Sequence, residues 1–238
     1  MIGGTTRLVG LLRDPKVGSL SPRMQNAAFA ALALDFAYVP LGVATERLED
    51  GVRGLVALGF AGANVTTPHK LAVVALCDEV EGGVESVNTL VIRDGRVLGS
   101  STDTAALGDR RPTRAAVIGA GGAATAWIAE LEARGAVVDV FSRRSDWPPR
   151  TEQVELVVQA TPVRDELLFE PRDGQIVIDL AYRADGGETS HAAAARAAGC
   201  ELVDGLDVLV AQGAASFERW TGSPAPVQVM RAAVRSPA

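Results

Sequence analysis

A continuous apolar run leads directly into a glycine-rich turn at Ala115-Ala116-Val117-Ile118-Gly119-Ala120-Gly121-Gly122-Ala123-Ala124. Such a run is typical of a parallel strand covered on both faces, and a helix is predicted to follow over about residues 123–134. With Gly119, Gly121 and Ala124, the turn fits G-x-G-x-x-G/A in the strand–turn–helix context of a dinucleotide site. Gly119 permits the tight turn, and Gly121 lets the backbone approach a pyrophosphate at the helix N-terminus. The alternative is a glycine-rich turn that only packs closely.

The next predicted strand, Val137–Phe141, ends in Ser142-Arg143-Arg144. A protein that binds NAD usually places Asp or Glu at this strand end, where the carboxylate accepts from the ribose 2′-hydroxyl. No carboxylate stands there, and Asp139 lies inside the strand. Arginine binds a 2′-phosphate through charge-assisted bonds, so the sequence favours NADP as the cofactor. The other interpretation is that both arginines are solvated surface residues.

Length and composition limit the class of protein. The chain has 238 residues, which corresponds to one or two domains, and its 47% hydrophobic and 22% charged residues are typical of a globular protein. The 25 glycines beside only 5% aromatic residues indicate many tight turns between short elements. A net charge of −6 disfavours a general nucleic-acid binder, which needs a basic surface. Local arginines can still bind an anionic small molecule.

Signals for export, membrane insertion and metal binding are missing from the sequence. Residues 1–7 lack the apolar core of a signal peptide, and no apolar run approaches the roughly 18 residues of a membrane span. Cys77 and Cys200 lack metal-like spacing, and with only two histidines we expect no metal site. We therefore expect a cytoplasmic protein without a membrane partner, and the net charge argues against a nucleic-acid partner. A small-molecule substrate is expected. We expect a monomer or homodimer, and which of the two it is cannot be read from the sequence.

The chain alternates between predicted strands and helices. Ser21, as N-cap, and Pro22 open the first predicted helix, Thr45 begins one that ends near Gly59, and Pro68 starts a third. Asp94-Gly95 favours a two-residue hairpin turn between residues 88–93 and 96–100. Further strands are predicted at 7–12, 36–41, 63–65, 156–160, 176–180 and, more weakly, 202–203. Further helices are predicted at 189–198, 206–220 and 226–235, with His191 as a surface residue.

Several short polar motifs carry a specific resemblance. Gly18-Ser19-Leu20-Ser21-Pro22 with Asn26 resembles the S-x-S-P…N motif of the shikimate dehydrogenase family, and Asn64-Val65-Thr66-Thr67-Pro68-His69-Lys70 resembles its N-V-T-x-P-x-K segment. Val87-Asn88-Thr89-Leu90 resembles V-N-T-L, and Ser101-Thr102-Asp103 stands where the family has N-T-D. Asp179-Leu180-Ala181-Tyr182 resembles D-x-x-Y, and residues 205–212 resemble G-x-x-M-L-x-x-Q. The order and spacing agree over almost the entire chain.

The resemblance and the element pattern imply an α/β fold of two lobes with a cleft between them. A polar run at 109–114 indicates a boundary between Thr104 and Arg114. We expect an N-terminal α/β substrate-binding domain over residues 1–104 and a Rossmann-like NADP-binding domain over 105–212. The resemblance implies that the C-terminal helices, 213–238, pack back on the first domain.

The family's activity is the reversible, NADP-dependent reduction of 3-dehydroshikimate to shikimate in the shikimate pathway of aromatic amino-acid biosynthesis. By this resemblance Ser19 and Ser21 hold the substrate carboxylate, while Asn88, Asp103 and Gln212 bind ring hydroxyls. Thr66 and Tyr182 complete the implied substrate site. Each residue taken singly also has a structural interpretation: Ser21 as a helix cap, Thr66 as a strand end, Asn88 in a turn and Tyr182 in packing.

Lys70 and Asp103 form the implied catalytic pair. A lysine ammonium can stabilise the oxygen of a reduced carbonyl and supply its proton, although a lone lysine is more often solvated. His69 is interpreted as non-catalytic. The implied cofactor contacts are Gly119, Ala120, Gly121, Gly122, Ala123, Ser142, Arg143, Arg144, Thr161 and Gly205.

Three positions depart from the family pattern and leave the substrate open. Ser101 replaces an asparagine, Gln159 replaces another in the segment 159–164, and Ala184 stands where a proline is common. A quinate or aminoshikimate dehydrogenase is therefore an alternative within the family. A nucleotide-binding regulator without turnover is an alternative from another class, because fold does not fix function.

Overall fold

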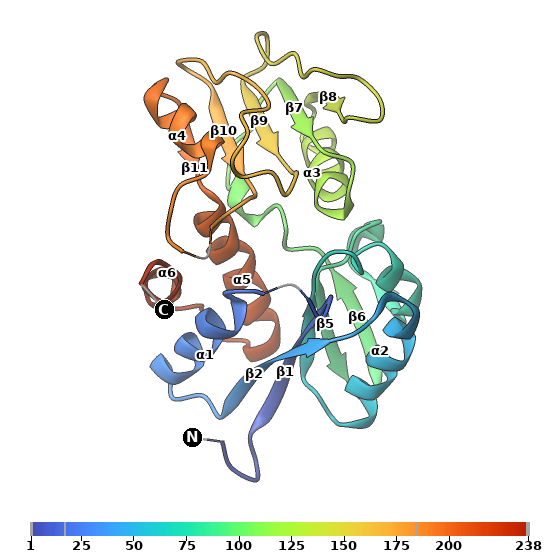
Figure 1. The fold of residues 1–238 in the computed structure, drawn as a ribbon. Coiled ribbons are helices and arrows are strands. Elements are labelled where there is room, and N and C mark those ends of the chain that lie inside the picture. The colour runs from blue at the N-terminus through green and yellow to red at the C-terminus, as the bar shows by residue number, and fades with distance from the viewer. Residues whose placement is uncertain (1, 17, 184, 237–238) are drawn as a thin grey trace. The chain divides into compact units, whose positions relative to one another are not determined.

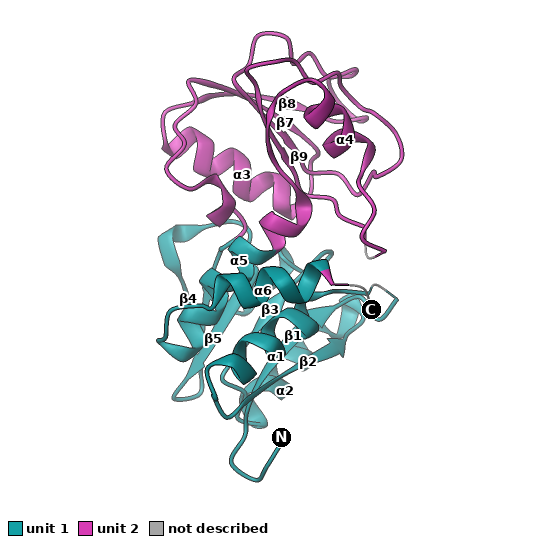
Figure 2. Cartoon of the chain, turned by 90° about the vertical axis from the view of Figure 1, so that its left-hand side faces the viewer, with its two compact units in different colours: residues 1–102, 210–235 teal, residues 103–209, 236–238 magenta. Residues whose placement is uncertain are grey.

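The computed structural model describes residues 2–16, 18–183 and 185–236. The chain forms two compact units (Figure 2). Unit 1 comprises residues 1–102 and 210–235, so it is built from both ends of the chain, and unit 2 comprises residues 103–209 with 236–238. Both units combine a sheet with helices, which confirms the predicted α/β class (Figure 1).

Unit 1 contains a six-stranded mixed sheet of order β2-β1-β3-β5-β6-β4. Strand β1 pairs in parallel with β2 and β3, whereas β5 pairs antiparallel with β3 and β6, and β4 is parallel to β6. The bounds are β1 Arg7–Arg13, β2 Phe36–Gly42, β3 Gly62–Val65, β4 Glu79–Val80, β5 Thr89–Arg93 and β6 Arg96–Ser100. The predicted hairpin is confirmed, because Arg93 lies opposite Arg96 and the two residues between them both have positive φ.

Helices cover both faces of this sheet. On one face Leu48, Val52 and Leu55 of α2 (Leu48–Ala57) pack with Leu90 and Val97. On the other face lie α1 (Ser21–Ala31), the C-terminal part of α5 (Gly205–Thr221), and α6 (Val227–Arg235), which packs along α1. A row of stacked rings, Phe36–Phe29–Phe217, joins β2, α1 and α5 at centroid distances of 5.1 and 5.2 Å.

Two helix predictions in unit 1 are wrong in detail. Leu20, not Ser21, is the N-cap of α1, and the Leu20 side chain makes no capping hydrogen bond. The helix predicted from Pro68 is a 3₁₀ segment, Ala72–Leu76. The carbonyl of Lys70 accepts from the Val87 N–H at 3.0 Å. A longer helix would instead use this carbonyl for a hydrogen bond within the helix. Other 3₁₀ segments are Thr45–Arg47, Glu81–Gly83 and Ala105–Leu107.

Unit 2 contains a five-stranded parallel sheet of order β11-β10-β9-β7-β8. Its strands are β7 Arg114–Ile118, β8 Val137–Phe141, β9 Leu156–Gln159, β10 Ile176–Asp179 and β11 Glu201–Val203, with helices α3 Gly122–Ala133 and α4 Ser190–Ala197. Residues 115–118 are fully buried and contribute to the hydrophobic clusters of both sheet faces. The chain leaves β7 toward β8 on one side, while β9 lies on the other, so the glycine-rich turn stands at a switch in strand order.

Two buried titratable groups hold unit 2 together near α4. The carboxylate of Asp179, at the end of β10, accepts from the Thr189 hydroxyl and from the Ala181 N–H, and Thr189 in turn caps α4 by accepting from the Ala192 N–H. His191, predicted at the surface, is fully buried: its Nε2 accepts from the Leu168 N–H at 3.0 Å and its ring stacks on Phe169. An alanine-rich segment shows no apolar stripe, so the buried face of α4 is hard to identify from sequence.

Replacing Gly62 is expected to destabilise unit 1. An added Cβ would overlap the Leu90 carbonyl and the Trp220 indole nitrogen, which donates to that carbonyl at 2.9 Å. Gly62→Ala should lower the free energy of unfolding by about 1–3 kcal/mol, the usual cost of overpacking. The control is Gly54→Ala in α2, where nothing lies within 4 Å of an added Cβ, and it should stabilise by about 0.5–1 kcal/mol. Equal effects of the two variants in urea titrations would contradict this assignment.

Asp179 and His191 are expected to give opposite pH dependences of stability. Burial raises the pKa of Asp179 to about 6, so its stabilising contribution is complete below about pH 4 and is lost as the pH rises through 6. Burial lowers the pKa of His191 to about 4, so its contribution is complete above pH 6.5 and is lost as the pH falls through 4.

The contributions of Asp179 and His191 to the free energy of unfolding change in opposite directions over the same pH window. Variants that remove one group at a time separate the two contributions. In Asp179→Asn the free energy of unfolding should rise from pH 4 to pH 6.5, because, of these two groups, His191 alone still titrates. In His191→Gln it should fall over the same window, by up to about 3 kcal/mol. Urea titrations at several pH values measure both slopes, and parallel slopes in the two variants would refute the assignment.

Candidate functional site

The glycine-rich turn of unit 2 has the backbone that a dinucleotide site needs. Gly119 has a φ of +135°, and a Cβ there would press on the Ala160 backbone at 3.0–3.1 Å. Gly121, the N-cap of α3, is extended and exposed, and nothing lies within 4 Å of the place a Cβ would take. The first N–H groups of a helix have no intrahelical partner, so the turn offers donors to a pyrophosphate in open space. The residues present fit the phosphate portion of the predicted cofactor.

The other predicted cofactor residues around this turn are placed as follows. Ala120 is exposed, Gly122 and Ala123 are half-buried, and Ala124 is fully buried against β7. After β9, the buried amide of Gln159 closes the next loop: it accepts from the Thr161 N–H at 2.5 Å and donates to the Val163 carbonyl at 3.0 Å. Two hydrogen bonds therefore accommodate the departure at Gln159, and Thr161 is held at the start of the loop.

The D-x-x-Y segment meets the beginning of α5 within unit 2. A Cβ on Gly205 would overlap the Ala181 carbonyl, so only glycine allows this approach. Tyr182 is half-buried and its carbonyl accepts from Arg164 Nε at 2.7 Å. The departure at Ala184 lies outside the described residues.

After β8 come the half-buried Ser142 and the exposed Arg143 and Arg144. The Ser142 hydroxyl lies 2.8 Å from the Ser145 hydroxyl and accepts from the Arg144 N–H. Arg143 donates to both carboxylate oxygens of Glu166, at 2.8 and 3.0 Å, and its guanidinium lies over the Trp147 ring. A 2′-phosphate here would meet two guanidinium groups. That of Arg143 already pairs with Glu166, and that of Arg144 has no ion pair in the described residues.

In unit 1 the predicted serines lie together. The Ser19 hydroxyl donates to Ser21 Oγ at 3.1 Å and accepts from the Ser21 N–H, so the first serine fixes the start of α1. Ser21 is buried and its hydroxyl also bonds with Tyr38. Two hydroxyls on one turn suit a carboxylate, which accepts from short, low-entropy donors.

Asn88 is the centre of a buried polar network in unit 1. Its Nδ2 donates to Gln212 Oε1 and Thr102 Oγ1, both at 3.0 Å, and its Oδ1 accepts from the Thr102 N–H at 2.8 Å and from the Thr89 hydroxyl at 2.9 Å. The network brings together Asn88 and Gln212, two predicted substrate residues separated by 124 positions in sequence. Their amides are therefore held in fixed orientations.

The backbone segments that carry the two candidate catalytic residues are both hydrogen-bonded to Asn88 or to its neighbour Val87. The Lys70 carbonyl accepts from Val87, the residue before Asn88, and Asp103 follows Thr102, which Asn88 binds. Lys70 and Asp103 are 8% and 6% exposed, so the interpretation of Lys70 as an ordinary solvated lysine is wrong. His69 beside it is also buried, with Nε2 3.1 Å from the Val43 carbonyl. Thr66 is half-buried at the end of β3, where its N–H donates to Leu12.

Three further residues support the site but were not among the predicted site residues. Asn26 donates to and accepts from the backbone of Tyr38, at 2.9 and 2.8 Å, and so ties α1 to β2. Asn64 accepts from the Tyr38 hydroxyl at 2.8 Å and donates to Ser216 at 3.0 Å. Asn26 and Asn64 belong to the recognised motifs, and these motifs could have identified them as supporting residues. Ser216 lies in an ordinary helical stretch and gives none.

Metal and membrane features are not found in the described residues. No group of three or more His, Cys, Asp or Glu side chains among them could hold a metal ion. Within the same residues, no helix has both the length and the apolar character needed to cross a bilayer.

Comparison with known proteins agrees with the motifs. The family model of the shikimate dehydrogenase substrate binding domain matches residues 14–90, and that of the shikimate 5′-dehydrogenase C-terminal domain matches residues 205–235. A shikimate dehydrogenase (NADP(+)) from Anaeromyxobacter sp. (strain Fw109-5) is 41% identical over 279 aligned positions, covering 100% of this chain and 99% of the relative.

Solved structures resemble this fold over nearly its whole length. Shikimate dehydrogenase from Aquifex aeolicus matches with a TM-score of 0.88 and 29% identity, covering 99% of this chain and 100% of that chain. Shikimate 5-dehydrogenase from Thermus thermophilus, in complex with NADP(H) and shikimate, matches with a TM-score of 0.84 and 29% identity, covering 97% and 99%. Because the sequence similarity extends over the entire chain, the protein belongs to the shikimate dehydrogenase family.

Proposed function

We propose that this protein catalyses the reversible, NADP-dependent reduction of 3-dehydroshikimate to shikimate. The observation that carries the proposal is the buried network that fixes the Asn88 and Gln212 amides beside the backbone segments of Lys70 and Asp103. The named activity of full-length relatives supports the same reaction. The cytoplasmic location and the monomeric or homodimeric state stay predictions of the sequence.

The substrate is a ring with one carboxylate and several hydroxyl or keto groups. In the proposal the paired hydroxyls of Ser19 and Ser21 hold its carboxylate, while Gln212 and Asn88 bind ring hydroxyls. All four hydrogen-bonding positions of the Asn88 amide are used inside unit 1, so Asn88 binds the substrate by exchanging its bond to Gln212 for one to a ring hydroxyl. Because the Asn88 amide is bonded to Thr102 and Thr89 as well as to Gln212, little of its rotational freedom remains to be lost on binding. Thr66 and Tyr182 complete the proposed substrate contacts.

Lys70 supplies the proton in the proposed reaction. Bound NADPH supplies a hydride to the carbonyl carbon. The carbonyl oxygen then takes a proton from the Lys70 ammonium, giving a secondary alcohol and a neutral amine, and the reverse reaction returns that proton to the amine. Asp103, the second member of the proposed catalytic pair, binds the neighbouring ring hydroxyl. A preorganised cation in a buried site stabilises the developing alkoxide more than it would in water.

The scarcity of lysine supports this role. All but two of the 23 basic residues are arginines, and the two lysines are the exposed Lys16 and the buried Lys70. A guanidinium cannot release a proton in a protein, whereas a buried ammonium can. A site that needs only a positive charge could use arginine; a site that needs a transferable proton could not.

One departure bears on which ring acid is preferred. The Ser101 hydroxyl is buried and has no hydrogen-bond partner among the described residues, and it stands directly before Thr102-Asp103. The departure at Ser101 keeps quinate and aminoshikimate as alternative substrates. Turnover measured with shikimate, quinate and aminoshikimate, each with NADP and with NAD, would rank the three substrates. Binding of NADPH without turnover of any of the three would favour the regulator alternative.

Lys70→Arg tests the proton transfer. It keeps the charge and removes the titratable ammonium, so kcat should fall about 10²–10⁴-fold while NADPH affinity stays within twofold. The matched control is Lys16→Arg, which makes the same chemical change at an exposed position and should leave kcat unchanged. Stopped-flow and steady-state NADPH oxidation measure both, and near-normal turnover of Lys70→Arg would remove Lys70 from the chemistry.

Replacing Arg143 and Arg144 together tests the choice of cofactor. The double alanine variant should weaken NADPH binding at least tenfold, because charge-assisted bonds to phosphate contribute about 1.5–3 kcal/mol, and should change NADH binding little. Arg150→Ala is the control, since Arg150 is also exposed and instead pairs with Asp146. Fluorescence titration gives the two dissociation constants, and equal losses for NADPH and NADH would rule out a 2′-phosphate contact.

A further inference from the structure

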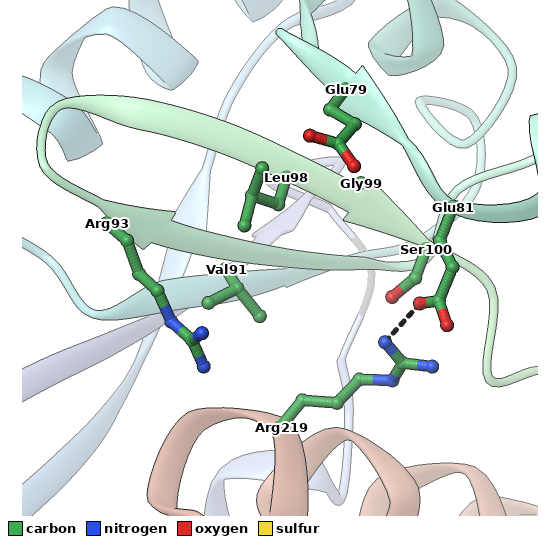
Figure 3. A pocket seen from close by; sticks show the side chains of 8 residues that line it. All are labelled: Glu79, Glu81, Val91, Arg93, Leu98, Gly99, Ser100 and Arg219. Atoms are coloured by element: carbon green, nitrogen blue, oxygen red, sulfur yellow. Dashed lines mark hydrogen bonds and ion pairs between the residues drawn. The ribbon is translucent and has the colours of Figure 1, made fainter.

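A pocket of about 220 Å³ lies in unit 1 between the sheet and α5 (Figure 3). It is lined by Glu79, Glu81, Val91, Arg93, Leu98, Gly99, Ser100 and Arg219. None of these residues belongs to the proposed substrate or cofactor contacts. The strand register explains the layout: Val91 lies opposite Leu98, with Arg93 toward the hairpin end and Ser100 at the other end of the same sheet face.

One end of the pocket presents a cation and an anion side by side. Arg219 Nη1 donates to Glu81 Oε2 (Figure 3). In the described part of the chain, the other polar atoms of these two groups have no further partner. The side chains are 36% and 64% exposed, so solvent and small molecules reach both. The pair can therefore accept a second charged group on each side.

Ser100 adds a hydroxyl without a partner. The residue is 4% exposed, and its Oγ makes no hydrogen bond to any described residue. Figure 3 shows this hydroxyl directed into the pocket beside the Arg219–Glu81 pair. A buried hydroxyl without a partner costs free energy, and a bound acceptor at this place would remove that cost.

The three groups together define the ligand. A simple anion would be attracted by Arg219 and repelled by Glu81. A simple cation would be attracted by Glu81 and repelled by Arg219. A molecule with adjacent ammonium and carboxylate groups satisfies both, and its carboxylate also accepts from Ser100. Beyond this end the floor is Val91 and Leu98, which suits an aliphatic substituent. We propose that this pocket binds a free α-amino acid with an aliphatic side chain.

Three ligands separate the charges in a binding experiment. L-leucine carries both charges, N-acetyl-L-leucine only the carboxylate, and L-leucinamide only the ammonium. Ligand-observed NMR titration of the full chain, without cofactor or ring substrate, should give saturable L-leucine binding with a Kd at or below about 1 mM. Each derivative should bind at least tenfold more weakly. Equal binding of N-acetyl-L-leucine, or no saturation by L-leucine up to about 10 mM, would overturn the proposal.

Ser100→Ala tests the site with little risk to the fold. Because Ser100 Oγ has no partner among the described residues, the free variant should unfold at the same or a higher urea concentration, while L-leucine affinity should fall at least fivefold. Ser86→Ala is the matched control: Ser86 Oγ is also buried without a partner in the described part of the chain, and it does not line the pocket. Equal affinity for L-leucine in Ser100→Ala and wild type would refute the role of Ser100 and with it the proposed site.

Glu81→Gln tests the ammonium contact independently. It should weaken L-leucine at least tenfold and leave N-acetyl-L-leucine unchanged or tighter, because the repulsion of its carboxylate is removed. Glu85→Gln, a nearby exposed change outside the pocket, should alter neither. Unchanged L-leucine binding in Glu81→Gln would contradict the proposal. None of these measurements depends on turnover, so the proposed dehydrogenase activity and this site can fail separately.

Discussion

The side-chain amide of Asn88 is the contact on which unit 1 depends. It uses both its donor and its acceptor on Gln212, Thr102 and Thr89, while the Asn88 backbone pairs with Val65 on one side and Ser100 on the other. Strands β3, β5 and β6 and helix α5 are thereby joined at one residue. A buried amide that lost one of these partners would cost about 1–3 kcal/mol. The same bonds that stabilise the unit also orient the groups proposed to bind substrate.

The overall charge of the protein is a poor guide to its ligands. The chain carries a net charge of −6, yet its proposed substrate and cofactor are both anions. Recognition rests on short-range groups: helix N–H donors after Gly119, guanidinium groups at 143 and 144, and one buried ammonium. Screening in water confines each of these to its immediate surroundings, so the sum of distant carboxylates has little influence on binding.

Patterns that depend on local backbone geometry were predictable from the sequence. The turn after β7, the hairpin at Asp94-Gly95 and the continuous apolar strand each follow from a few neighbouring residues. Contacts that join distant segments were not predictable. The 3₁₀ segment at 72–76 follows Lys70, whose carbonyl accepts from the distant Val87 N–H, and the buried His191 accepts from Leu168 and stacks on Phe169. The short strand β4, Glu79–Val80, also exists only through its pairing with β6.

Unit 1 is assembled from both ends of the chain, and this has a consequence for its synthesis on the ribosome. Four residues that complete unit 1 leave the ribosome only after the main segment of unit 2, residues 103–209: Gln212, Ser216, Phe217 and Trp220. Until then Leu90 lacks its indole donor, Phe29 one of its stacked rings and Asn88 its amide partner. The main segment of unit 2 is uninterrupted and can fold as soon as residue 209 is exposed. The N-terminal sheet is thus made first and completed last, so a nascent or prematurely terminated chain leaves its apolar face uncovered.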